Sequence, residues 1–267
     1  MTAPDAPPLE VRALVWGHRG QWIGGPWTAT LGRGEVLAVL GPNGAGKTTL
    51  FRTLIGSELA VSGDVLWRGR AQPGLAPRDL AASVAFVPQL GGEALELSVS
   101  DYVMLGCIAR KGWFARPAPD DRAVVAQVLE RLGLERLADR PLGRVSGGER
   151  QLAGVARAVA QQPAVLVLDE PTASLDFGNQ ESVLAQLASL AADGLTVIFS
   201  THQPNHAQRL ASRVLALDGS GPGRYGNAEE ILRPDLLSAL YGVPVRRIDG
   251  PDESVFVVGG RGFRGVK

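Results

Sequence analysis

Gly41-Pro42-Asn43-Gly44-Ala45-Gly46-Lys47-Thr48-Thr49 is the stretch on which the fold of this chain depends. It lies between an apolar run, residues 36–40, and a helix-like segment, residues 50–55. The spacing G-x-x-x-x-G-K-[ST] between a strand and a helix is typical of a phosphate-binding loop. Glycines let successive backbone N–H groups face one anion, and the helix that follows adds its unpaired N–H groups and its positive dipole end. We expect a bound nucleoside triphosphate, with Lys47 at its β- and γ-phosphates and Thr48 on Mg²⁺.

The composition indicates an ordinary globular protein. The 267 residues are 45% hydrophobic and 20% charged, which fits one large domain or a domain with an inserted subdomain. Lys+Arg and Asp+Glu both number 27, and a net charge of zero argues against nucleic acid as a partner. The single cysteine, Cys107, has no internal disulfide partner, so we expect a reducing cytoplasmic setting and a core position for it.

Neither the start of the chain nor its interior contains a targeting or membrane-spanning pattern. Residues 1–8 lack a basic region followed by an apolar core, so we expect a short irregular lead rather than a signal peptide. No run of eighteen apolar residues occurs in the sequence. If the protein acts at a membrane, it must do so by docking onto a membrane partner.

The order of the predicted elements indicates four parts. Residues 1–89 begin with two half-buried strands, predicted antiparallel, at 9–15 and 27–31, and Gly24-Gly25-Pro26 is predicted to break the chain between them. Residues 90–160 show helical spacing and read as an inserted helical subdomain. In residues 161–245 apolar strands alternate with helices, the first of which is predicted at 181–192. Residues 246–267 form a tail with one predicted strand, 255–258, and no assigned role.

Apolar strands that alternate with helices predict a mostly parallel sheet covered on both faces. The fold class is therefore α/β: a P-loop nucleotide-triphosphatase core, an N-terminal antiparallel β patch and an inserted α-helical subdomain.

Two carboxylates end a buried strand, residues 164–168. Ligands bind at the carboxyl ends of strands in open α/β sheets, so Asp169 and Glu170 should face the phosphate loop. Asp169 suits the Mg²⁺ shell, and Glu170 is predicted to orient or deprotonate the attacking water. A strand that merely ends in polar residues is the structural alternative.

Ser146-Gly147-Gly148-Glu149 opens another predicted helix. Ser146 and Glu149 have capping-box spacing, which gives much of the motif a structural explanation, but the two glycines are not explained by a cap. Together they make a second helix N-terminus that can bind an anion. One nucleotide rarely needs two cradles, so we expect each ATP to lie between the phosphate loop of one copy and the Ser146 region of another.

Three further features become informative only beside the phosphate loop. His202 follows a strand and can bridge the γ-phosphate and the attacking water, although a lone histidine is more often structural. Gln89 ends a short strand, and its amide oxygen can ligate Mg²⁺ and sense the γ-phosphate. Ser174-Leu175-Asp176 follows the two carboxylates and, taken alone, is explained by an ordinary turn and helix cap.

Taken together and in this order, the motifs resemble the nucleotide-binding subunit of the ABC transporter ATPases, over residues 9–245. In that family they are the Walker A, Q-loop, signature, Walker B, D-loop and H-loop, carried here by residues 41–49, Gln89, 146–149, 169–170, 174–176 and His202. The resemblance implies ATP and Mg²⁺ as cofactors, catalytic roles for Lys47, Gln89, Glu170 and His202, and Thr48, Gln89 and Asp169 around the metal. It also implies a head-to-tail homodimer and a membrane subunit that docks at Gln89 and the helical subdomain.

Finer motifs resemble one branch of that family. Asp176-Phe177-Gly178-Asn179-Gln180 and residues 236–244 look like importers of iron–siderophore, haem, cobalamin and related metal complexes. Residues 201–205 are similar to a sub-branch that also handles molybdate or tungstate. The family stacks adenine on an aromatic residue upstream of the phosphate loop; by spacing that position is His18, with Trp16 and Trp22 as neighbours.

The expected protein is therefore the ATP-hydrolysing subunit of an importer for an iron or other metal complex, peripheral at the cytoplasmic face of the membrane. Its expected partners are a second copy of itself, two copies of a multi-helix permease and, indirectly, a substrate-binding protein. The alternatives are a molybdate or tungstate importer, an exporter or lipid-directed ATPase, and a soluble ABC ATPase of the iron–sulfur assembly type. The sequence does not identify the cargo.

Overall fold

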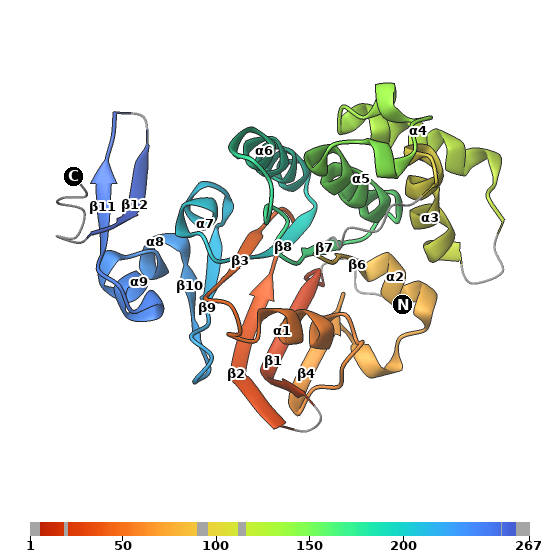
Figure 1. Cartoon of the computed structure of the whole chain (residues 1–267). Helices are drawn as coiled ribbons and strands as arrows, with labels where there is room; N and C mark the ends of the chain where they lie inside the picture. The colour runs from red at the N-terminus through yellow and green to blue at the C-terminus, as the bar shows by residue number, and fades with distance from the viewer. Residues whose placement is uncertain (1–5, 19–20, 90–95, 112–115, 252, 260–267) are drawn as a thin grey trace.

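The computed structural model describes residues 6–18, 21–89, 96–111, 116–251 and 253–259 (Figure 1). Most of the expected irregular lead, the first residues of the predicted helical subdomain and the end of the tail lie outside these ranges. The strands are β1 (Leu9–His18), β2 (Gln21–Leu31), β3 (Val36–Leu40), β4 (Ser62–Trp67), β5 (Arg70–Ala71), β6 (Val84–Val87), β7 (Val165–Leu168), β8 (Thr196–Thr201), β9 (Arg213–Ala216), β10 (Arg224–Asn227), β11 (Val245–Asp249) and β12 (Ser254–Val258). The α-helices are α1 (Lys47–Leu54), α2 (Pro77–Ser83), α3 (Val99–Lys111), α4 (Pro119–Arg131), α5 (Gly147–Ala160), α6 (Phe177–Ala192), α7 (Pro204–Leu210), α8 (Ala228–Ile231) and α9 (Pro234–Tyr241).

A six-stranded sheet of order β10-β9-β3-β8-β7-β6 forms the centre of the molecule. Its strands pair in parallel from β9 to β6, and β10 is the antiparallel edge strand. All five residues of β3 are buried, and alternate residues enter different cores. Val36, Ala38 and Leu40 pack with the helices that include α5 and α6, whereas Leu37 and Val39 pack with α1 and the N-terminal strands. The predicted sheet with both faces covered is confirmed.

The N-terminal antiparallel sheet, of order β2-β1-β4-β5, covers α1 from the side opposite the central sheet (Figure 1). The prediction that Gly24-Gly25-Pro26 separates two strands is wrong, because these residues lie inside β2 and the chain reverses between His18 and Gln21. A Cβ atom on Gly24 would lie 2.3 Å from Cζ2 of the buried Trp16. Glycine at this position therefore makes room for an indole ring on the neighbouring strand, and no turn is needed to explain it.

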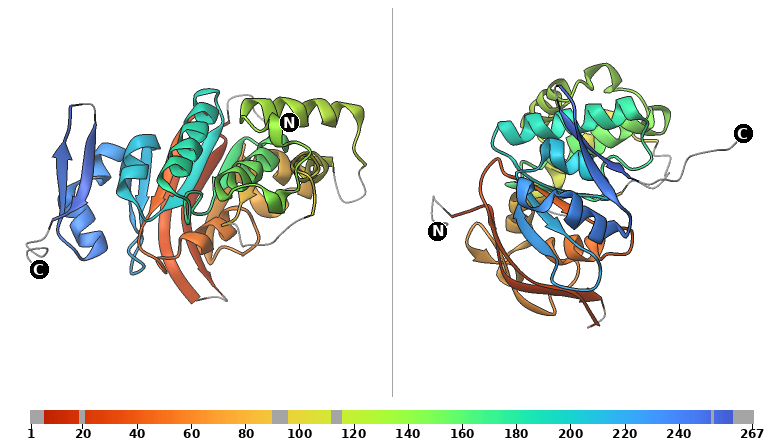
Figure 2. Two further views of the ribbon diagram at one scale, coloured as in Figure 1. Left: turned by 45° about the horizontal axis from the view of Figure 1, so that its top comes forward. Right: turned by 90° about the vertical axis from the view of Figure 1, so that its left-hand side faces the viewer.

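Helices α3, α4 and α5 pack on one another at one end of the molecule, and all three lie within residues 90–160, the interval predicted to be a helical subdomain (Figure 2). A Cβ atom on Gly106 of α3 would lie 1.9 Å from the Arg157 carbonyl oxygen of α5, so glycine permits this close approach. Cys107 is fully buried, as expected, and burial raises the pKa of its thiol. In the part of the chain that the structure describes, no helix is both long enough and apolar enough to cross a membrane.

The C-terminal part departs most from the sequence prediction. The predicted strand 255–258 exists as β12, but it pairs with β11, a strand that the sequence did not predict. The resulting hairpin stands at the opposite end of the molecule from α3 and α4 (Figure 2). Helix α6 begins at Phe177, four residues before the predicted start, because the Asp176 carboxylate caps it by accepting a hydrogen bond from the Asn179 N–H at 2.8 Å.

Candidate functional site

Four parallel strands end at one edge of the central sheet, and the predicted site residues follow them directly. Leu40 of β3 pairs with Thr201 of β8, and Leu168 of β7 pairs with both Phe199 of β8 and Val87 of β6. The residues that come next are Gly41, His202, Asp169 with Glu170, and, two positions after β6, Gln89. The topology therefore gathers segments as far apart in sequence as Gly41 and His202 at the strand ends where α/β proteins bind ligands.

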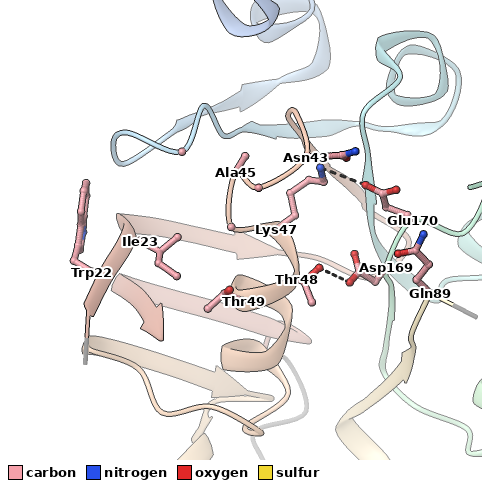
Figure 3. Close-up of a pocket in the computed structure, with 13 residues that line it drawn as sticks. Trp22, Ile23, Asn43, Ala45, Lys47, Thr48, Thr49, Gln89, Asp169 and Glu170 are labelled. Atoms are coloured by element: carbon pink, nitrogen blue, oxygen red, sulfur yellow. Dashed lines mark hydrogen bonds and ion pairs between the residues drawn. The ribbon is translucent and has the colours of Figure 1, made fainter. Parts of the chain in front are cut away.

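A cavity of about 560 Å³ lies at this edge, within the usual range for ligand sites (Figure 3). It is lined by Trp22, Ile23, Asn43, Gly44, Ala45, Gly46, Lys47, Thr48, Thr49, Gln89, Asp169, Glu170 and Gly219. The structure thus brings together most of the phosphate loop with three of the four residues predicted from the other strand ends. The exception is His202, which contacts the site through Glu170, with 3.6 Å between Nδ1 and a carboxylate oxygen.

The phosphate loop is shaped by glycines and held by its own lysine. Gly44 and Gly46 have φ angles of 82° and 88°, in the left-handed region that glycine adopts without a Cβ penalty. The Lys47 ammonium donates to the carbonyl oxygens of Gly41 at 2.8 Å and Pro42 at 3.0 Å. Because Lys47 also begins α1, its charge lies at the point where the helix N–H groups open toward the cavity.

Asp169 lies at the centre of a hydrogen-bonded set of oxygen atoms. One of its carboxylate oxygens accepts from the Thr48 hydroxyl at 2.7 Å and the other from the Ser200 hydroxyl at 2.6 Å, while the Glu170 N–H donates to the Ser200 oxygen at 2.8 Å. Sequence reasoning gave Ser200 no role, although it directly precedes the Thr201-His202 pair. Ser200 therefore links the Asp169 carboxylate to the Glu170 backbone.

The residues near Asp169 fit a magnesium ion that arrives with a nucleotide. The Thr48 hydroxyl, the Asp169 carboxylate and the Gln89 amide supply oxygen atoms, the donors that Mg²⁺ prefers (Figure 3). Among the described residues no cluster of three His, Cys, Asp or Glu side chains forms a metal cage. The usual Mg²⁺ site takes one or two carboxylates and completes its shell with phosphates and water.

Glu170 occupies a strained position between the side chains of Lys47 and His202. Its φ angle of 46° is left-handed, a conformation that costs a non-glycine residue on the order of 1–3 kcal/mol. Its two carboxylate oxygens lie 3.4 Å from the Lys47 ammonium and 3.6 Å from Nδ1 of His202. Strain at a residue with these partners is typical of a functional position rather than of a strand that merely ends in polar residues.

The Ser146–Glu149 motif does not line the cavity of its own chain. The predicted capping box is confirmed: the Ser146 N–H donates to the Glu149 carboxylate at 2.7 Å, and the Glu149 N–H donates to the Ser146 hydroxyl at 3.2 Å. A Cβ atom on Gly148 would lie 2.2 Å from Oδ1 of Asn179, so this glycine is needed for close packing on α6. Ser146 itself is exposed and remains at the surface as a helix start.

The segment Ser174-Leu175-Asp176 connects the Glu170 region to α6. Ser174 has a left-handed φ of 62°, and the predicted cap is confirmed at Asp176. Leu175 lies next to Gly147, because a Cβ atom on that glycine would be 3.6 Å from Cδ2 of the leucine. Behind this segment, the Thr172 hydroxyl shares a buried 3.2 Å hydrogen bond with Nδ1 of His206, whose pKa burial lowers. The Ser146 motif and this segment therefore form one surface.

The structure places His18 and Trp22 differently from the expectation for adenine. His18 lies near Glu58, with 3.3 Å between Nδ1 and Oε1, and it does not line the cavity. Trp22 does line it and is 49% exposed, with its indole ring standing at the edge beyond Ile23 (Figure 3). Spacing along the chain does not decide between the two residues, because β1 and β2 are paired and a residue of either strand can reach the cavity.

A phosphate loop, an oxygen-rich metal position and a strained carboxylate at the edge of a parallel sheet define a P-loop nucleoside triphosphatase. A family model described as "ABC transporter" matches residues 26–173. The chain is 37% identical to the molybdate import ATP-binding protein MolC of Haemophilus influenzae, over 80% of each chain. It is 31% identical to the iron(3+)-hydroxamate import ATP-binding protein FhuC of Bacillus subtilis, over 91% of each.

A solved structure described as an inward-facing conformation of a putative metal-chelate type ABC transporter superposes with a TM-score of 0.83 at 32% identity, covering 95% of this chain and 98% of the other. The chain therefore belongs to the ATP-binding proteins of the ABC transporter family. Its activity is ATP hydrolysis coupled to transport.

Proposed function

We propose that this protein energises the uptake of an iron complex or another metal chelate through a separate permease. The observation that carries the proposal is the match to an iron(3+)-hydroxamate import ATPase along 91% of both chains, which includes the region after His202. The Asp176–Gln180 motif, on the surface beside the Ser146 helix, points to the same branch. Because one relative is a molybdate import protein, molybdate or tungstate is the second candidate cargo. Both relatives are import proteins, which disfavours a soluble assembly ATPase.

The active form in this proposal is a head-to-tail homodimer. The exposed start of α5 carries a capped N-terminus that its own cavity does not use. A two-fold operation applied to the chain lets each Ser146 region complete the other copy's site, because contacts in such a pair are reciprocal. Ser146, Gly147, Gly148 and Glu149 then bind ATP in trans, and Ser174, Leu175 and Asp176 accompany them.

Hydrolysis proceeds by positioning and charge stabilisation. Lys47 exchanges the carbonyl oxygens of Gly41 and Pro42 for the β- and γ-phosphate oxygens of ATP. Glu170 accepts the proton of the attacking water or orients it, and His202 bridges this water and the γ-phosphate. Thr48, Asp169 and Gln89 hold Mg²⁺, which neutralises phosphate charge when it is bound.

The permease determines where the protein acts. In this proposal two copies of a multi-helix permease receive the ATPase dimer at Gln89 and the helical subdomain, on the cytoplasmic face of the membrane. A substrate-binding protein contacts only the permease. ATP binding closes the dimer, and the permease converts the movement of the helical subdomains into alternating access.

The function is tested by purifying the protein with the permease encoded beside it and reconstituting the complex in lipid vesicles. We expect the ATPase rate to rise when binding protein loaded with an iron complex is added, compared with empty binding protein. Haem, cobalamin and molybdate complete the panel, and a complex that carries Glu170→Gln is the control for contaminating ATPases. If only molybdate raises the ATPase rate, the protein is a molybdate importer subunit. If no cargo raises the rate, the import proposal is contradicted.

Adenine recognition gives a sharper test of the cavity. We expect Trp22→Ala to weaken ATP binding about 3- to 10-fold, because an aromatic stack contributes roughly 0.5–1.5 kcal/mol beyond area burial. His18→Ala is the matched control and should leave the dissociation constant unchanged, since His18 faces Glu58 instead of the cavity. Titration calorimetry with ATP and with inorganic triphosphate separates base from phosphate contacts. A larger loss in His18→Ala would restore the assignment that the sequence favoured.

A further inference from the structure

An apolar hollow of about 310 Å³ lies between the start of α7 and the C-terminal hairpin. Its walls include His202, Pro204, Tyr241, Val243, Phe256 and Val258. One wall is therefore the histidine that pairs with Glu170, and the opposite wall is the hairpin to which neither the sequence nor the proposed mechanism gives a role. Val243 and Val258 are 38% and 71% exposed, so apolar surface is open to water beside the nucleotide site.

The hollow has a fixed shape because α7 holds the hairpin at several points. The Asn205 amide donates to the Phe256 carbonyl oxygen at 3.1 Å and accepts from the Phe256 N–H at 2.7 Å. The Gln208 amide donates to the carbonyl oxygen of Ser254 at 2.8 Å. Since α7 begins two residues after His202, these bonds keep the hairpin at a constant position relative to the histidine.

A suitable occupant for this hollow is exposed elsewhere on the same chain. Phe177, the first residue of α6, is 78% exposed and directly follows Asp176. Covering a phenylalanine side chain contributes roughly 1.5–3 kcal/mol, so leaving it in water is unfavourable unless a partner covers it. In sequence it lies between Leu175 and Asn179, the residues next to Gly147 and Gly148.

Reciprocal contacts in the proposed dimer bring this phenylalanine to the hollow. If the Ser146 region of one copy reaches the phosphates at the other copy's Lys47, the surface around its Gly148 and Asn179 arrives at the same edge. On the receiving copy, Lys47 lies 3.4 Å from Glu170, and Glu170 lies 3.6 Å from His202. The hollow begins at His202, so it continues the surface on which the partner lands.

We propose that, when ATP closes the dimer, the hollow receives Phe177 of the partner subunit, which makes the C-terminal hairpin part of the dimer interface. This inference rests on the homodimer of the proposed function. Two hollows and two phenylalanines contribute to each dimer by symmetry. The contact joins the segment after Glu170 in one copy to the segment after His202 in the other, so closure aligns His202 as it buries the ring.

The first test measures ATP-dependent dimerisation by sedimentation velocity in Glu170→Gln protein, where turnover does not reopen the dimer. Addition of Phe177→Ala is expected to weaken dimerisation about 10²- to 10⁴-fold, because two buried rings are lost and every 1.4 kcal/mol is about tenfold. Leu59→Ala is the matched control: Leu59 is 88% exposed and lies outside both surfaces, and its removal should change nothing. An unchanged dimerisation constant in Phe177→Ala would overturn the proposal.

The second test asks whether the two residues meet. Protein carrying Phe177→Cys is mixed with protein carrying Val243→Cys, both with Cys107→Ala and Glu170→Gln, and treated with a short bismaleimide. A covalent heterodimer should form with ATP and not without it; each protein alone, and Leu59→Cys mixed with Val243→Cys, are the controls. If Glu170→Gln protein dimerises with ATP but the cysteine pair gives no cross-linked product, the contact is refuted and the dimer is not. If Glu170→Gln protein never dimerises, both the proposed dimer and the contact are refuted. The Val243→Cys thiol is also tested with a single maleimide in the absence of ATP. If it cannot be labelled, the chain's own C-terminal residues fill the hollow and the proposal is overturned.

Discussion

Glu170→Gln is expected to bind ATP at least as tightly as the unaltered protein while its turnover falls about 10²- to 10⁴-fold, the usual contribution of general acid–base catalysis. The amide has nearly the size and shape of the carboxylate, so the left-handed backbone and the Ser200 hydrogen bond are retained. What is lost is the negative charge that accepts a proton. Losing it also removes repulsion between Glu170 and the γ-phosphate, so affinity should not fall.

The measurement is a steady-state phosphate-release assay beside titration calorimetry. Glu229→Gln, an exposed glutamate on α8 far along the chain from the site, is the matched control and should behave as the unaltered protein. If Glu170→Gln retains turnover within tenfold of the unaltered protein, the carboxylate is a pairing group for Lys47 and His202 and the base lies elsewhere.

Most of the site could be predicted because the topology of a parallel sheet is restrictive. Residues 36–40 and 164–168 are predicted as buried parallel strands, so their carboxyl ends must lie at the same edge of the sheet. Gln89 and His202 follow strands of the same kind and are therefore expected at that edge. The capping box at Ser146 was equally readable, because it depends on two side chains three residues apart. These features depend on local pattern, which a single sequence contains.

What could not be predicted depends on contacts across the fold. The sequence predicts a break at Gly24-Gly25-Pro26, although Gly24 makes room for the ring of Trp16 on the neighbouring strand. His18 and Trp22 lie on either side of the same turn, and only strand pairing decides which side chain reaches the cavity. The exposed β11 contains two consecutive arginines and does not alternate between polar and apolar residues, so its pairing with β12 was not readable from the sequence.

Lys47→Ala is expected to lower turnover on the order of 10³-fold and, unlike Glu170→Gln, to weaken ATP binding, because charge-assisted hydrogen bonds contribute about 1.5–3 kcal/mol. Lys47 is 5% exposed and its ammonium is the cation nearest to Glu170, so its loss leaves that carboxylate facing the γ-phosphate without its closest positive partner. ATP should then no longer raise the melting temperature, since ligand stabilisation follows affinity.

Lys47→Arg separates the charge of this residue from its shape. The ammonium sits between two carbonyl oxygens at 2.8 and 3.0 Å, and a planar guanidinium presents its donors in a wider, fixed fork. We expect Lys47→Arg to be nearly as inactive as Lys47→Ala, measured by the same calorimetry and phosphate release. Full ATP affinity in Lys47→Arg would show that the loop needs only a positive charge.

Adding Glu170→Gln to Lys47→Ala should restore part of the ATP affinity, because the side chain left without its lysine is then neutral. Simple additivity of the two changes would contradict the coupling that the 3.4 Å contact implies.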